Sequence, residues 1–301
     1  MPSSPPSEHF AGVHTAVITP FRDGEFDAAA FRSLIDRQCQ AGIAGIVPVG
    51  TTGESPTLTH QEHARVIETA VQHTAGRALV IAGTGSNSTS EAVSLTKAAE
   101  RAGADAALLV APYYNKPSQQ GLFLHFQAIA EATALPLILY SIPGRCGIEI
   151  GVETVVRLAS ASPTIAGIKE AGGTPERISQ FRDVLPEGFA ILSGDDSLTL
   201  PFLSVGACGV VSVAANLIPQ VMADLVRLAL TGDWDGARAL HARYYPVFRA
   251  LLQLDTNPVP IKTAMELAGL ANAELRLPLA PIAPEGRDQL FRVLRDLDLL
   301  S

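Results

Sequence analysis

Residues 163–173 read Pro-Thr-Ile-Ala-Gly-Ile-Lys-Glu-Ala-Gly-Gly, a short apolar run that ends at Lys169. The β-branched residues of this run predict a buried strand. Burying an ammonium group is unfavourable, so Lys169 either finds partners or has a lowered pKa. A lysine with a lowered pKa can attack a carbonyl and form a Schiff base. The alternative is an ordinary lysine that extends from the strand end into solvent.

Similar apolar runs recur along the chain, each followed by a turn and then by a segment with helical periodicity. Successive runs lie about 20 to 35 residues apart, the length of one strand-helix unit with parallel strands. Eight such units predict a closed (β/α)₈ TIM barrel. An open doubly wound sheet is the alternative, but Ser88 replaces the third glycine of its nucleotide-binding motif. The runs are 13–19, 45–49, 79–83, 107–111, 136–140, 164–168, 189–193 and 209–213.

The order of the strand and helix patterns along the chain predicts three parts. Residues 1–12 begin with a Pro/Ser-rich stretch, and we expect a disordered or extended tail there. Residues 13–231 form the barrel, which a helix over 220–230 closes. Residues 232–301 carry three more helical patterns, over 233–254, 258–268 and 284–300, and predict a helical extension packed on the barrel.

The overall composition is typical of a soluble globular enzyme, with 47% hydrophobic and 17% charged residues among 301. A formal net charge of -8 argues against a nucleic-acid partner. Three widely spaced cysteines, Cys39, Cys146 and Cys208, suggest no disulfide framework and suit the cytoplasm. No apolar run reaches the length of a membrane span, so we expect no membrane partner.

The carboxyl ends of the strands are where barrel enzymes place their chemistry. Here they carry one amine, several hydroxyls and one guanidinium, without a histidine or thiolate cluster. Each also has a purely structural explanation. For example, Asp195 and Asp196 could be a helix N-cap and a first-turn carboxylate. The strand-end stretches are Gly50-Thr-Thr-Gly-Glu-Ser55, Pro112-Tyr-Tyr-Asn115, Tyr140-Ser-Ile-Pro-Gly-Arg145, Lys169, Gly194-Asp-Asp196 and Val211-Ser212.

Taken together, these groups fit Schiff-base chemistry on a 2-oxo acid. Tyrosine and threonine hydroxyls can relay protons without adding charge. Backbone N–H groups of the Gly/Thr turn can hold a carboxylate, and the planar fork of Arg145 suits the carboxylate of a second substrate. We expect no metal and no organic cofactor, because the imine itself is the electron sink.

The chain resembles the dihydrodipicolinate synthase (4-hydroxy-tetrahydrodipicolinate synthase) family, within the pyruvate-dependent class I aldolases and lyases that include N-acetylneuraminate lyase. The resemblance runs from about Val13 to the C-terminus, with every motif in order. It implies condensation of pyruvate with L-aspartate 4-semialdehyde in lysine and diaminopimelate biosynthesis. The motifs are Thr19-Pro-Phe21, Gly50 to Ser55, Pro112 to Pro117, Tyr140 to Gly147, Gly167 to Glu170, Ser193 to Asp196 and Asn257-Pro-Val-Pro-Ile-Lys262.

The resemblance also implies residue roles. Lys169 matches the imine-forming lysine, Tyr140 the tyrosine above it, Thr51 the linking threonine, and Tyr114 a tyrosine supplied by a neighbouring subunit of a dimer of dimers. Substrate-binding positions match Thr52 for the pyruvate carboxylate, Arg145 for the semialdehyde carboxylate, Val211 for a main-chain contact and Gly194 in the adjacent loop. A site for inhibitory L-lysine matches Ser55, His60, His63, Asn87, Glu91 and Tyr113.

Two features favour a synthase over a sugar-acid lyase, namely Gly-Thr-Thr-Gly-Glu in place of the lyases' Gly-Ser-Thr-Gly-Glu, and Arg145. Ser141, Gly144 and Cys146 depart from the commoner Asn, Ser and Thr around the second-substrate pocket, and Pro56 departs from Ala beside the lysine site. The alternatives are another pyruvate-dependent aldolase, of the N-acetylneuraminate lyase or 2-oxo acid type, and a sensor that binds a small acid without turnover. A class II metal aldolase is disfavoured, because the histidines lie away from the strand ends.

Overall fold

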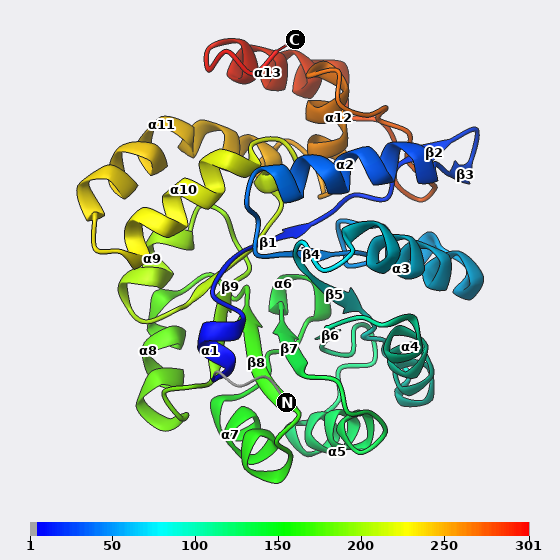
Figure 1. Cartoon of the computed structure of the whole chain (residues 1–301), viewed down its shortest axis with the longest axis vertical. Coiled ribbons are helices and arrows are strands. Elements are labelled where there is room, and N and C mark those ends of the chain that lie inside the picture. Colours follow the sequence, from blue (N-terminus) through cyan, green and yellow to red (C-terminus); the bar gives the residue numbers. More distant parts are fainter. Residues whose placement is uncertain (1–4, 301) are drawn as a thin grey trace.

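The computed structural model describes residues 5–300, and its strands close into a parallel (β/α)₈ barrel (Figure 1). The neighbour order around the ring is β1-β10-β9-β8-β7-β6-β5-β4. All eight runs expected from the sequence are strands of this barrel, so the fold prediction is confirmed. The strands are β1 Gly12–Ala16, β4 Gly45–Val47, β5 Leu79–Gly83, β6 Ala106–Val110, β7 Leu137–Ser141, β8 Ile165–Glu170, β9 Ala190–Ser193 and β10 Gly209–Ser212.

Helices surround the barrel, and a small antiparallel hairpin of β2 Phe21–Arg22 and β3 Glu25–Phe26 follows β1. Helix starts follow local chemistry: Asp27 caps the helix that begins at Ala28, and Thr59 with Glu62 forms a capping box on the helix that begins at His60. The outer helices are α2 Ala28–Gln40, α3 His60–Thr74, α4 Thr89–Ala102, α5 Gln119–Ala130, α7 Val152–Ala161, α8 Pro175–Val184, α9 Thr199–Ser204 and α10 Pro219–Leu230. Shorter turns are η1 Ser55–Thr57, α6 Pro143–Cys146 and η2 Ala214–Asn216.

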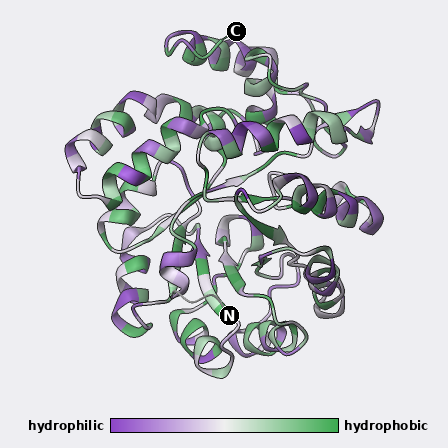
Figure 2. Ribbon diagram, viewed as in Figure 1, coloured by the Kyte–Doolittle hydropathy of each residue, from purple (hydrophilic) through white to green (hydrophobic). Residues whose placement is uncertain are grey.

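The core has two layers, one inside the barrel and one between strands and helices. Figure 2 shows the corresponding pattern, with polar residues on the outer helix surfaces and apolar residues on the strands. Within residues 5–300, no helix is both long and apolar enough to cross a membrane.

A β-bulge in β8 decides which way Lys169 points. Leu137 pairs with Ile165, but the next residue of β7, Ile138, pairs with Gly167, so Ala166 is an extra residue. Side chains alternate between the two faces of a strand, and one inserted residue reverses the alternation beyond it. Ile165 and Ile168 therefore both pack on the helix side, three positions apart. Lys169, opposite Tyr140 in the register, consequently faces the barrel interior.

The C-terminal extension consists of α11 Trp234–Gln253, α12 Val259–Leu267 and α13 Pro284–Arg295. Helix α11 packs on α10, and α13 contacts both α11 and α12. In Figure 1, α12 and α13 lie at one end of the molecule, beyond α2. The chain between α12 and α13 returns to the β2–β3 hairpin, where Glu274 accepts hydrogen bonds from Asp23 and Gly24.

The expectation of an extended or disordered tail over residues 1–12 is wrong for the part that the structure describes. Pro6–His9 forms one helical turn, α1, and β1 already begins at Gly12. Proline is well suited to the first position of a helix, so a Pro/Ser-rich composition does not exclude a helical turn here. Phe10 is 1% exposed and packs with the barrel-interior residues, which ties this segment down. Residues 1–4 lie outside the described part of the chain.

Candidate active site

A cavity of about 580 Å³ opens at the carboxyl ends of the strands. Most of the site residues expected from the sequence line it, although they come from distant parts of the chain. They are Thr51, Thr52, Ser55, His60, His63, Glu91, Tyr113, Tyr140, Arg145, Lys169 and Gly194. Tyr114, Val211 and Asn87 are not among its lining residues.

Lys169 is the buried amine of this cavity, with 6% of its surface exposed. Its Nζ lies 4.0 Å from the centre of the Tyr140 ring. Loss of solvent lowers the pKa of Lys169 to about 7, an effect that Asp196 opposes and Arg145 reinforces. A large fraction of this amine is therefore uncharged at neutral pH, which is the state that attacks a carbonyl.

Tyr140 pairs with Lys169 in the register of the two neighbouring strands and carries a phenolic hydroxyl. Burial raises the pKa of Tyr140, while the nearby charge of Arg145 and a hydrogen-bonding interaction with Thr51 lower it less strongly. The phenol is consequently protonated at neutral pH. It can donate a proton to a developing oxyanion and recover it through a neighbouring hydroxyl.

The 50–55 loop follows β4 and holds two threonines in the cavity. It is closed by hydrogen bonds from Gly53 N to Gly50 O at 3.1 Å and from Glu54 N to Thr51 O at 3.1 Å. The Thr19 hydroxyl donates to Gly53 O at 2.7 Å. Any side chain on Gly53 would meet the Val49 backbone at 2.9 Å, so only glycine fits this turn.

Asn257, from the C-terminal extension, is a site residue to which the sequence analysis assigned no role. Its Nδ2 donates to Thr52 Oγ1 at 3.0 Å, and its carbonyl oxygen accepts from Arg145 Nη2 at 3.0 Å. Asn257 also lines the cavity. The sequence did place Asn257 in the motif Asn257 to Lys262. No local pattern, however, connects that motif with Arg145 or Thr52, which lie about 100 and 200 positions away.

Asp196 is the second residue whose place the sequence did not reveal. The structural explanation of Asp195 and Asp196 as helix caps is wrong, because α9 begins after Leu198 without a side-chain cap. Asp196 instead accepts hydrogen bonds from Ser212 Oγ, from Val213 N at 3.1 Å and from Ala214 N at 2.8 Å. Burial raises the pKa of Asp196 to about 6. This carboxylate anchors the turn after β10, and its charge favours protonation of Lys169.

A polar cluster lies on the α3–α4 side of the cavity. His60 Nε2 is 2.7 Å from Glu91 Oε1, and the Ser86 hydroxyl donates to the same carboxylate. His63 Nε2 is 2.9 Å from Gly83 O. Asn87 Nδ2 donates to Tyr113 O at 3.1 Å, so it holds a lining residue in place. Within residues 5–300, no group of three or more His, Cys, Asp or Glu is arranged to hold a metal ion.

Two expected residues lie elsewhere. Val211 is expected to contribute a main-chain group, which stays a prediction; its side chain is 1% exposed and packs in the barrel interior, and Val213 lines the cavity two positions later. Tyr114 is 90% exposed and has φ of 73°, a left-handed conformation that is strained for a bulky residue. Within one copy of the chain, its side chain is therefore directed to solvent.

The three departures in the second-substrate region have different surroundings. The Ser141 hydroxyl accepts from Ile150 N at 3.3 Å, and Cys146 Sγ is 3.1 Å from Ala111 O. Cys146 also lines the cavity. A Cβ on Gly144 would meet nothing within 4 Å, so the serine common at this position would be accommodated.

Comparison with known proteins shows what the whole chain is similar to. Residues 9–297 match the Dihydrodipicolinate synthetase family. A 4-hydroxy-tetrahydrodipicolinate synthase from Persephonella marina is 50% identical over 97% of this chain and 99% of its own. The structure of 4-hydroxy-tetrahydrodipicolinate synthase from Methylacidiphilum fumariolicum SolV is 52% identical, with a TM-score of 0.94 over 97% of this chain and 100% of that one. A lysine-bound structure of the Cyanidioschyzon merolae enzyme is 41% identical, with a TM-score of 0.94 over 97% and 99%.

Proposed function

The chain belongs to the dihydrodipicolinate synthetase family, and we propose that it condenses pyruvate with L-aspartate 4-semialdehyde to give 4-hydroxy-tetrahydrodipicolinate. The reaction is the entry step of the diaminopimelate route to lysine, and the chain is a lyase with a class I aldolase mechanism. The observation that carries this proposal is the buried amine of Lys169 beside Tyr140 in the cavity.

The chemistry begins with attack of the Lys169 amine on the C2 carbonyl of pyruvate. A carbinolamine forms, loses water and gives a protonated imine. Loss of a proton from the methyl group then gives an enamine, whose carbon attacks the aldehyde of the second substrate. Tyr140 donates a proton to the departing water, its phenolate takes the proton lost from the methyl group, and it then protonates the new alkoxide, with Thr51 connecting this hydroxyl to the remainder of the relay. The amino group of the semialdehyde, after giving up a proton to the relay, attacks the imine carbon and displaces the Lys169 amine, which closes the ring and frees the lysine.

The substrate carboxylates are assigned to two different groups. Thr52 and the backbone N–H groups of the 50–55 loop bind the carboxylate of pyruvate, next to the amine that attacks it. Arg145, whose guanidinium is 3.0 Å from Asn257 O, binds the carboxylate of the semialdehyde. Gly194 leaves room near the imine, since a Cβ there would lie 3.1 Å from Lys169 Cε.

Tyr114 belongs to the relay of a neighbouring subunit in this proposal. Its 90% exposure and its strained backbone fit a side chain whose partner is a second copy of the chain. A homo-oligomer, with two tight dimers forming a tetramer, would then be the active form. Biosynthesis of lysine from these precursors also suits the cytoplasm.

L-lysine is the proposed inhibitor, at the site of Ser55, His60, His63, Asn87, Glu91 and Tyr113, where Ser86 donates a hydrogen bond to Glu91. The Glu91 carboxylate suits the ammonium group of an amino acid, and a further cavity of about 260 Å³ adjoins it. The relative whose structure has lysine bound supports the proposal that this chain binds lysine. A metal aldolase would need its ligands at the strand ends, whereas both histidines lie on α3 and contact Glu91 or backbone.

The decisive test is reduction with borohydride in the presence of pyruvate. We expect a stable adduct on the peptide that contains Lys169, detected by mass spectrometry, and none in Lys169→Arg. A coupled assay with L-aspartate 4-semialdehyde then tests the second substrate. Absence of the adduct from folded wild-type protein would overturn the proposed function. An adduct without semialdehyde turnover would favour another pyruvate-dependent aldolase.

A further inference from the structure

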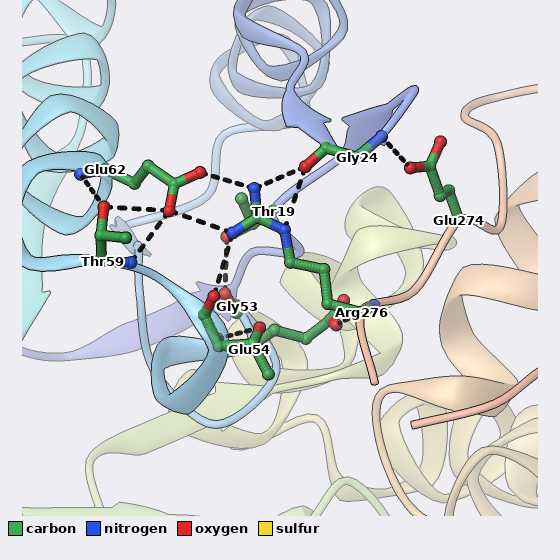
Figure 3. A network of polar contacts seen from close by, with 9 residues as sticks. Thr19, Gly24, Gly53, Glu54, Thr59, Glu62, Glu274 and Arg276 are labelled. Carbon is green, nitrogen blue, oxygen red and sulfur yellow. Dashed lines mark hydrogen bonds and ion pairs between the residues drawn. The ribbon is translucent and has the colours of Figure 1, made fainter. Parts of the chain in front are cut away.

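Residues 257–276 of the C-terminal extension contact the 50–55 loop at three points, and we infer that they position this loop for catalysis. The contacts are Asn257 with Thr52, Lys262 with Glu54, and Arg276 with Glu54. Figure 3 shows the part of this network around Glu54 and Arg276. The inference rests on the proposed function, in which Thr52 binds the carboxylate of pyruvate.

The first contact reaches the substrate-binding group itself. Asn257 Nδ2 donates to Thr52 Oγ1 at 3.0 Å, and Thr52 is 3% exposed. A hydroxyl that accepts this bond has its own hydrogen free to donate to a carboxylate. Asn257 therefore sets both the position and the donor direction of Thr52. It acts through Thr52, and so it is a positioning residue.

The second contact is a buried ion pair beneath the loop. Lys262 and Glu54 each have 0% of their side chain exposed, and their charged groups are in contact. Lys262 Nζ also donates to Glu274 O at 2.8 Å and lies 4.3 Å from the centre of the Phe21 ring. Glu54 adopts a left-handed φ of 54°, which is uncommon for a residue with a side chain. The ion pair holds this backbone conformation two positions after Thr52.

The third contact joins the loop to the hairpin and to α3. Arg276 N donates to Glu54 Oε2 at 3.2 Å. The Arg276 guanidinium pairs with Glu62 and donates to Thr57 O at 3.0 Å and to Gly24 O. As Figure 3 shows, the Arg276 side chain thus joins the extension to Gly24 in the hairpin and to Glu62 in α3, which are both distant from it in sequence. The loop has little freedom to move relative to the barrel.

An extension that positions the 50–55 loop should have different effects on the protein from an extension that only packs on the barrel. An extension that only packs on the barrel would alter thermal stability without changing the affinity for pyruvate. A positioning extension alters the affinity for pyruvate in a protein that remains folded, because carboxylate binding depends on where Thr52 lies. The binding of the second substrate should be unaffected by changes to the Asn257 side chain, because Arg145 bonds the Asn257 backbone and not its side chain.

The experiment is a double-mutant cycle of Asn257→Ala and Thr52→Val. The apparent dissociation constant for pyruvate is obtained from the initial rate of borohydride trapping as the pyruvate concentration is varied. Asn257→Ala should raise the dissociation constant for pyruvate roughly tenfold, the usual effect of losing one buried hydrogen bond. It should leave the KM for L-aspartate 4-semialdehyde within about twofold at saturating pyruvate, because the bond to Arg145 remains. In a protein that already carries Thr52→Val, Asn257→Ala should change the dissociation constant for pyruvate little.

Arg287→Ala is the matched control, since it removes an exposed ion pair with Glu266 within the extension and touches neither the loop nor the cavity. We expect wild-type pyruvate affinity for it. Additive effects of Asn257→Ala and Thr52→Val, or unchanged pyruvate affinity in folded Asn257→Ala, would overturn the inference. Both outcomes presuppose an adduct in the wild-type protein, so they are distinct from failure of the proposed function.

Discussion

Tyr140 and Lys169 stand opposite each other in neighbouring strands, and the Lys169 amine lies 4.0 Å from the centre of the Tyr140 ring. A parallel pair in register places both side chains on the same face of the sheet. That face is the barrel interior, where the pKa of the amine falls to about 7 and the pKa of the phenol rises. In the proposed mechanism, the same burial therefore prepares the nucleophile and keeps the adjacent proton donor protonated.

Imine formation should depend on pH through Lys169. Because the uncharged amine attacks, the rate of adduct formation with pyruvate should rise with pH and level off above an inflection near 7. Asp196 favours the charged form, so Asp196→Asn should move the inflection to lower pH. Stopped-flow rates of imine formation between about pH 5.5 and 9 measure both values. An inflection near the ordinary lysine value would contradict the assignment.

Tyr140→Phe separates proton transfer from imine formation. The ring remains beside Lys169, but the hydroxyl that donates protons is lost. We expect turnover to fall by about 10²- to 10⁴-fold, the range for a general acid-base group. Borohydride should still trap some pyruvate on Lys169. Near-normal turnover in this variant would exclude Tyr140 from the proton relay.

Tyr114→Phe tests the proposed contribution of a second subunit. Turnover should fall by roughly 10²-fold while pyruvate binding stays measurable, because the hydroxyl belongs to the relay and not to the carboxylate site. Mixing the impaired Tyr114→Phe with the inactive Lys169→Ala should restore part of the activity if subunits exchange, since mixed dimers regain one complete site. Unchanged turnover in Tyr114→Phe would show that the relay is assigned incorrectly.

Lys262→Met should destabilise the protein strongly. It leaves the Glu54 carboxylate buried without its ion-pair partner, a change that costs about 3–5 kcal/mol. Adding Glu54→Gln removes the uncompensated charge and should recover part of the loss. Thermal midpoints at one fixed protein concentration give the comparison. If Lys262→Met has the stability of wild type, the ion pair does not stabilise the fold.

Inhibition by L-lysine should depend on Glu91. Millimolar L-lysine should reduce activity of the wild type, and Glu91→Gln should weaken this inhibition because the ammonium group loses its carboxylate. Glu68→Gln, on the exposed side of α3, is the control and should respond like wild type. Activity that is insensitive to millimolar L-lysine in the wild type would refute this regulatory proposal.

Much of the fold could be predicted from local patterns. Each apolar run became a strand, because a run of this length between turn signals has few other ways to bury its side chains. Most of the expected site residues line one cavity, because parallel strands in a closed barrel all end on the same rim. Local reasoning failed at the amino end, where Pro6 begins a helical turn and Phe10 enters the barrel interior.

The sequence by itself determined the barrel, its rim chemistry and the amine that is central to the proposal, since these follow from the period and order of residues along the chain. Only the tertiary structure decided that Lys169 faces inward. The bulge at Ala166 reverses the alternation of β8, and regular spacing from Ile165 would have pointed the amine at the helices. The contacts of Asn257 with Thr52 and Arg145 also required three dimensions, because they join segments whose proximity exists only after the chain has folded.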